Sequence, residues 1–111
     1  MEEITFNKNV VYELDDLVIL LVKENYFSYL ETAEDYVNKI YDFIYNEIPN
    51  NRHRKTPKEL TQHGPYYVKY SAGKRTAWYV FFDKKDKRYL IEYITNNHVA
   101  KATFLNALNK N

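Results

Sequence analysis

The chain has 111 residues, enough for one domain with one hydrophobic core but too few for two. It contains no cysteine, which excludes disulfides and thiolate metal sites and favours a reducing, cytoplasmic location. The N-terminus lacks the basic start and apolar run of a signal peptide, and no apolar run approaches a bilayer span, so we expect no membrane partner.

The net charge of +1 conceals a strong asymmetry between the two halves of the chain. Residues 1–50 contain 11 acids and 3 lysines, a net charge of −8, whereas residues 51–111 contain 13 bases and 4 acids, a net charge of +9. Such a basic half predicts a surface that meets a polyanion such as nucleic acid. Charge alone leaves open the alternative of two solvated surfaces that merely differ in sign.

The first half of the chain predicts a short strand followed by two helices. Ile4 and Phe6 alternate with polar residues, as in a strand. Asn9 can cap a first helix that ends near Asn25. The apolar residues of this helix recur at helical spacing: Leu14, Leu17, Val18, Leu21 and Val22.

A second helix is predicted from Ser28, with Glu31 as its capping-box partner, to Pro49. Its apolar residues, three or four positions apart, form one stripe: Leu30, Ala33, Val37, Ile40, Ile44 and Ile48. Two helices with a short joint and facing stripes predict a helical hairpin, and their acids lie mostly off the stripes on solvated faces.

The segment 50–64 predicts a surface connection, with a short turn around Pro57–Thr61. Three runs with a period of two then predict an antiparallel meander: Tyr66–Ser71, Arg75–Asp83 and Arg88–Thr95. The middle run is apolar on both faces, as expected of a central strand. Val99, Ala102, Leu105 and Leu108 indicate a short final helix.

The predicted fold class is therefore α+β, in the order β-α-α-β-β-β with a final helix. A single domain, residues 1–111, packs an N-terminal helical hairpin on an antiparallel sheet. Residues 1–50 form the first strand and the hairpin, residues 65–95 form the meander, and residues 97–111 form a C-terminal tail or short helix.

Two groups of residues could bind or cleave RNA. Cations are clustered in the second half: Arg52, Arg54, Lys55, Lys58, Lys69, Lys74 and Arg75. Together with tyrosines such as Tyr93 they offer phosphate neutralisation and rings for base stacking, although a charged rim with structural tyrosines would look the same. His98 follows the last strand and could serve as a general acid or base, although a lone histidine is more often a surface residue.

Other chemistry has little support in the sequence. His53 and His63 are weaker candidates than His98, and the three histidines are too scattered to predict a zinc site. Glycine-rich phosphate loops and nucleophile elbows are missing, which argues against nucleotide-driven chemistry.

The strand and helix order is accompanied by four segments in the second half: Lys55-Thr56-Pro57-Lys58-Glu59-Leu60; Pro65-Tyr66-Tyr67-Val68-Lys69-Tyr70; Lys74-Arg75-Thr76-Ala77-Trp78-Tyr79-Val80-Phe81-Phe82; and Tyr89-Leu90-Ile91-Glu92-Tyr93-Ile94 with His98. In this order and in these segments the chain resembles the RelE/ParE superfamily of type II toxins. The resemblance covers nearly the whole chain and is strongest from about residue 50.

The resemblance implies a ribosome-dependent mRNA endoribonuclease that needs no metal or cofactor and is neutralised by a cognate antitoxin protein. Arg75 matches the arginine that holds the scissile phosphate, His98 the proposed general acid, and Lys69 a further basic position. One branch has a carboxylate base where this chain has Lys58, with Glu59 beside it. The alternatives are a ParE-like inhibitor of DNA gyrase, which lacks the catalytic set, and a degenerate member that acts only as a binding module.

Overall fold

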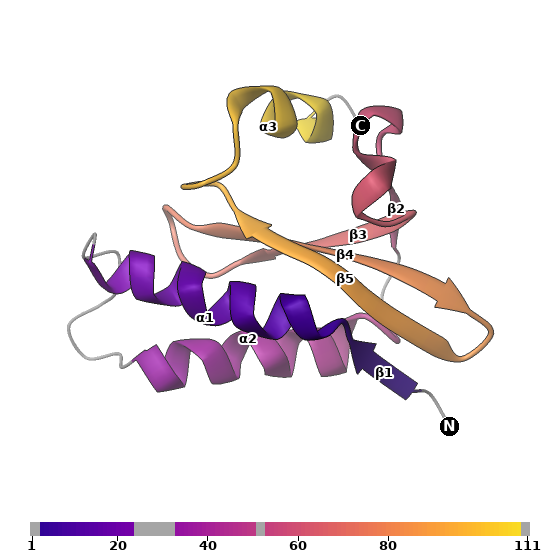
Figure 1. The fold of residues 1–111 in the computed structure, drawn as a ribbon, viewed down its shortest axis with the longest axis horizontal. Coiled ribbons are helices and arrows are strands. Elements are labelled where there is room, and N and C mark those ends of the chain that lie inside the picture. Colours follow the sequence, from indigo (N-terminus) through magenta and orange to yellow (C-terminus); the bar gives the residue numbers. More distant parts are fainter. Residues whose placement is uncertain (1–2, 24–32, 51–52, 110–111) are drawn as a thin grey trace.

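The computed structural model describes residues 3–23, 33–50 and 53–109 (Figure 1). In chain order its elements are β1 (Glu3–Phe6), α1 (Lys8–Lys23), α2 (Ala33–Glu47), β2 (Arg54–Lys55), the 3-10 helix η1 (Lys58–His63), β3 (Tyr66–Ser71), β4 (Ala77–Lys85), β5 (Arg88–Asn96) and α3 (Ala102–Asn109). The predicted α+β class and element order are confirmed. Two short elements, β2 and η1, lie in the segment that was predicted as a connection.

The five strands form one mixed sheet in the order β1-β5-β4-β3-β2. The meander β3-β4-β5 is antiparallel as predicted, but β1 runs parallel to β5, so the prediction of a purely antiparallel sheet was wrong. The pattern of β1 itself carries no information about its partner β5, which comes after both helices of the hairpin and three further strands along the chain. β1 covers only the first half of β5, from Arg88 to Ile91.

The sheet has a different helical layer on each face (Figure 1). The hairpin of α1 and α2 covers one face, and η1 and α3 lie on the other. The larger core lies under the hairpin and is anchored by a hydrogen bond of 2.9 Å from the Trp78 indole N–H to the Tyr36 hydroxyl. The smaller core contains Leu60, Tyr67, Tyr79, Phe81, Ala107 and Leu108.

The central strand β4 separates the two cores. Trp78, Val80 and Phe82 face the helical hairpin, whereas Tyr79 and Phe81 face η1 and α3. All five are buried, which confirms the prediction of a strand covered on both faces. The face to which a side chain of β4 points therefore determines which helical layer it contacts.

The helical hairpin differs from the prediction in detail. α1 begins at Lys8, and the Asn7 side chain, not that of Asn9, caps it by accepting a hydrogen bond of 3.0 Å from the Asn9 N–H. Val22 is 49 % exposed, so the apolar stripe of α1 is narrower at its end than predicted. The predicted cap at Ser28 and Glu31 lies outside the described residues. No helix among the described residues is long and apolar enough to cross a membrane.

Candidate nucleic-acid interface

Arg75 and His98 meet where the β3–β4 hairpin approaches the turn after β5. The hydroxyl of Thr76, the neighbour of Arg75, lies 2.9 Å from the Nε2 atom of His98. The Arg75 side chain is exposed and the His98 ring is half-buried. We call this group of Arg75, Thr76, Asn97 and His98 the hairpin end.

Two asparagines that precede His98 hold this arrangement. The Asn97 amide donates to the Arg75 carbonyl at 3.0 Å, and its oxygen accepts from the Ala77 N–H at 2.9 Å. The Asn96 side-chain oxygen accepts from the backbone N–H groups of His98 and Val99, at 2.9 and 3.2 Å. Sequence reasoning missed both roles, although the run Asn96-Asn97-His98 directly after a strand was the available signal.

The environment of His98 favours its neutral form. Burial lowers the pKa of the ring most, the nearby Arg75 charge lowers it further, and a hydrogen bond with the Arg75 backbone opposes these two effects. The net pKa lies below the usual 6.5, so the ring is mainly neutral at pH 7. A neutral imidazole can accept a proton, which suits a base better than an acid.

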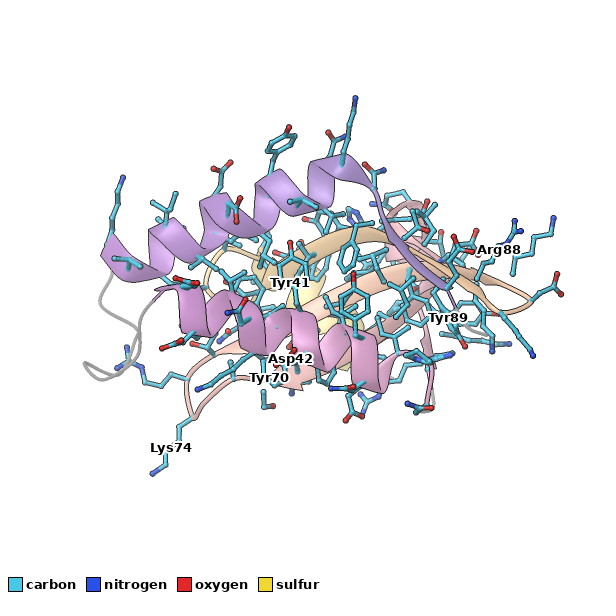
Figure 2. The ribbon with its side chains drawn as sticks, turned by 90° about the horizontal axis from the view of Figure 1, so that it is seen from below. Tyr41, Asp42, Tyr70, Lys74, Arg88 and Tyr89 are labelled. Atoms are coloured by element: carbon cyan, nitrogen blue, oxygen red, sulfur yellow. The ribbon has the colours of Figure 1, made fainter. Side chains whose placement is uncertain are left out.

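Lys74 directly precedes Arg75 of the hairpin end, whereas Lys69 lies further along the sheet. Lys74 is exposed in the turn that connects β3 to β4, at one extreme of the molecule (Figure 2). Lys69 pairs with Tyr79 of β4. Tyr79 is three residues after Thr76, so Lys69 lies about 10 Å from Thr76 in the direction of the strands. The alternation of β3 directs Lys69 to the same face as Tyr67, the face of η1 and α3.

The remaining predicted RNA-binding cations lie away from the hairpin end. Arg54 and Lys55 pair with Tyr67 and Tyr66, at the opposite end of β3. Lys58 is exposed in η1, and Arg52 lies outside the described residues. The cationic set is therefore not one continuous patch.

Tyr93 is also separate from the hairpin end. Its ring stacks on His63, with ring centroids 4.0 Å apart and planes at 16°, and packs against Phe81 and Phe104. One ring face is therefore already covered by the protein, which leaves less of Tyr93 for a base to stack on than a fully exposed ring would offer.

Carboxylates that could act as a base are present on the face of η1 and α3. Burial, with a smaller contribution from Asp83, raises the pKa of Glu92, whose side chain lies beside Gly64. Glu59 and His63 both line a cavity of about 850 Å³ on this side of the molecule. Among the described residues, no three histidine or acidic side chains are grouped as metal ligands would be.

Comparison with protein-family models, with curated proteins and with solved structures found no match for this chain.

Proposed function

We propose that this protein is a toxin of the RelE/ParE kind that acts on mRNA at the ribosome, with the hairpin end as its contact with the scissile phosphate. The supporting observation is that Arg75 and His98, which come from different parts of the meander, are adjacent. The Arg75 side chain is exposed and its charge acts on the neutral His98 ring, so the two groups could together bind a phosphate and accept a proton.

The proposed reaction is an attack by the ribose 2′-oxygen on the adjacent 3′-phosphate. A new 2′-oxygen–phosphorus bond forms as the bond to the 5′-oxygen of the next nucleotide breaks. The departing 5′-oxygen takes a proton from solvent water, which leaves a 2′,3′-cyclic phosphate and a 5′-hydroxyl. Arg75 would stabilise the charge that develops on the phosphate oxygens. His98 would accept the 2′-hydroxyl proton, because its lowered pKa favours this role over the acid role implied by the resemblance.

A substrate that uses Nε2 of His98 would have to replace the Thr76 hydroxyl. In the free protein this hydroxyl is hydrogen-bonded to Nε2 of His98. A 2′-hydroxyl would take the place of the threonine hydroxyl, which is a hydrogen-bonding group of the same chemical kind.

A second candidate function is non-enzymatic inhibition of DNA gyrase. The observation that favours it is the bonding of the His98 ring to Thr76 and to the Arg75 backbone, which fits a structural role for the imidazole. In that case the ring would hold the β3–β4 hairpin to the end of β5 and take no part in chemistry.

Expression in a bacterial host separates the two candidates. We would express the wild type, Arg75→Ala, His98→Gln and a control, Lys87→Ala, at the opposite end of the sheet, and then map mRNA 5′ ends and plasmid supercoiling. New 5′-hydroxyl ends in the wild type and control, reduced at least about 100-fold in the first two variants, are expected for the nuclease. Intact mRNA with altered supercoiling would replace this proposal with the second.

A further inference from the structure

The cavity of about 850 Å³ is bordered by η1, α3 and the end of β5, and we call it the η1–α3 cavity. Figure 1 shows η1 and α3 on the same side of the sheet. Leu60 of η1, Ala107 of α3 and Leu17 of α1 are buried and give the cavity an apolar lining. Its volume falls within the range of about 300–1,000 Å³ that is usual for sites that bind small molecules.

Three aromatic side chains line the η1–α3 cavity: His63, Tyr93 and Phe104. The rings of His63 and Tyr93 are stacked, with centroids 4.0 Å apart. The Phe104 ring is inclined by 55° to each of them, with centroids 5.7 Å from that of His63 and 6.4 Å from that of Tyr93. All three residues are partly exposed. They therefore offer aromatic surface in two orientations to a ligand.

The charged groups of the cavity are mostly acidic. Among the described residues that line it, Glu13 and Glu59 contribute carboxylates and Lys101 contributes an ammonium group. Burial lowers the pKa of His63, so this ring adds little positive charge at pH 7. The lining therefore carries net negative charge, which repels phosphates and attracts cations.

The combination of rings and carboxylates favours a guanidinium group over other cations. A guanidinium is planar and weakly hydrated, so it can leave water and lie against an aromatic face. Its N–H donors form a fork that matches the two oxygens of a carboxylate. An ammonium group would find the same charge, but it is compact and strongly hydrated and cannot stack on a ring.

We propose that the η1–α3 cavity binds a guanidinium group, which lies against the aromatic rings and donates hydrogen bonds to the carboxylates of Glu13 and Glu59. The apolar chain that carries the guanidinium contacts Leu17 and Leu60. This chemistry is shared by small guanidino compounds and by the arginine side chain of a polypeptide. All four residues of the hairpin end are described, and none of them lines the cavity, so the inference does not depend on the RNA-cleaving function.

Matched ligands test whether the cavity requires the charge. The ¹⁵N-labelled protein is titrated with Nα-acetyl-arginine-N-methylamide and with its citrulline analogue, in which a neutral urea replaces the guanidinium. We expect saturable binding of the arginine compound with a Kd of about 1 mM or lower and with the largest amide shifts in η1 and α3. The citrulline compound should bind at least about ten-fold more weakly, because it lacks the charge that the carboxylates attract.

A third ligand, n-propylguanidine, distinguishes the two sources of a guanidinium. It has the head group and chain of an arginine side chain but no peptide groups. Affinity equal to that of the arginine compound is expected if the natural ligand is a small guanidino compound. Binding at least about ten-fold weaker than that of the arginine compound is expected if the ligand is an arginine of a polypeptide.

Matched variants test the two carboxylates. Glu13→Gln with Glu59→Gln keeps the shape of both exposed side chains and should weaken the arginine compound at least about ten-fold. The control Asp16→Asn with Asp42→Asn removes the same charge from exposed positions outside the cavity and should leave the Kd within about two-fold.

The aromatic contribution has a separate variant. Phe104→Leu keeps an apolar side chain but removes the ring, and it should weaken the arginine compound about five-fold. The amide spectrum of each variant shows whether the protein is folded.

Three results would overturn the proposal: no saturable binding at about 10 mM of the arginine compound, equal binding of the citrulline compound, or unchanged affinity in the folded variant with Glu13→Gln and Glu59→Gln. The mapping of mRNA ends is a separate measurement, so a failure of the nuclease proposal and a failure of this one are distinguishable.

Discussion

At the scale of single residues, Asn97 is the side chain on which the hairpin end most depends. It bonds to the backbone of both Arg75 and Ala77, so Asn97→Ala removes two hydrogen bonds at once. We expect a loss of about 1–3 kcal/mol in the free energy of unfolding, measured by urea denaturation. The control Asn106→Ala, at an exposed position of α3, should change stability by less than about 0.5 kcal/mol. Equal effects of the two substitutions would contradict the role of Asn97.

The histidines predict how stability depends on pH. Burial is the largest cause that lowers the pKa of His53, His63 and His98 in the folded protein. The unfolded chain therefore binds protons before the folded one as pH falls through about 6.5, and the free energy of unfolding should decrease on acidification. We expect this decrease between about pH 7.5 and 6 in urea titrations, with a smaller slope in His98→Gln.

Glu92 acts in the opposite direction and in a lower pH range. Its pKa is raised from 4.5, so the folded state holds this proton longer and loses stability as pH rises from about 4.5 toward the folded pKa. The histidine effect should therefore be measured above about pH 6. A wild-type stability that is flat or rises on acidification from about pH 7.5 would contradict the histidine environments.

At the scale of elements, the hydrogen bond between Tyr36 and Trp78 joins α2 to the sheet within a shared hydrophobic core. Both side chains are buried, so Tyr36→Phe would leave the Trp78 indole N–H without this partner inside the core. We expect a loss of about 1–3 kcal/mol in the free energy of unfolding. The matched change Tyr41→Phe, in a half-buried ring packed on Phe6, should cost less than about 0.5 kcal/mol, and a larger effect there would contradict this account.

The elements also show how much of the fold the sequence predicts. Long periodic segments, such as those of α1, β4 and β5, were predicted because their patterns are local. β2 has only two residues, so its sequence cannot show the two-residue periodicity of a strand. The pairing of β1 with β5 joins residues far apart in the chain, so the local pattern of β1 does not predict it.

The candidate site was predictable to a similar extent. The meander brings the start of β4 close to the end of β5, so the meeting of Arg75 and His98 followed from the strand order. The bonds of Asn96 and Asn97 were not predictable, because an asparagine after a strand has many possible partners. The separation of Arg54 and Lys55 from this site follows from their pairing with the far end of β3.

At the scale of the whole molecule, exposed basic residues lie at both ends of the sheet. Lys74 and Arg75 are at the β3–β4 connection, and Lys85, Lys87 and Arg88 are at the β4–β5 connection. Figure 2 shows Lys74 and Arg88 at opposite extremes. Net charge cannot tell which end meets a polyanion, because both are basic, but the dependence of binding on salt can.

Removing two charges from one end at a time tests the proposal that RNA binds at the hairpin end. If RNA contacts the hairpin end, Lys74→Ala with Arg75→Ala should weaken binding of a single-stranded RNA and reduce the slope of log K against log salt by about 1.4, since each lost phosphate contact removes about 0.7. Lys85→Ala with Lys87→Ala removes the same charge from the other end and should leave the slope unchanged. Fluorescence anisotropy across a salt series measures both. A larger reduction of the slope in the variant with Lys85→Ala and Lys87→Ala would place the RNA contact at the β4–β5 hairpin. That result would contradict the proposed roles of Arg75 and His98.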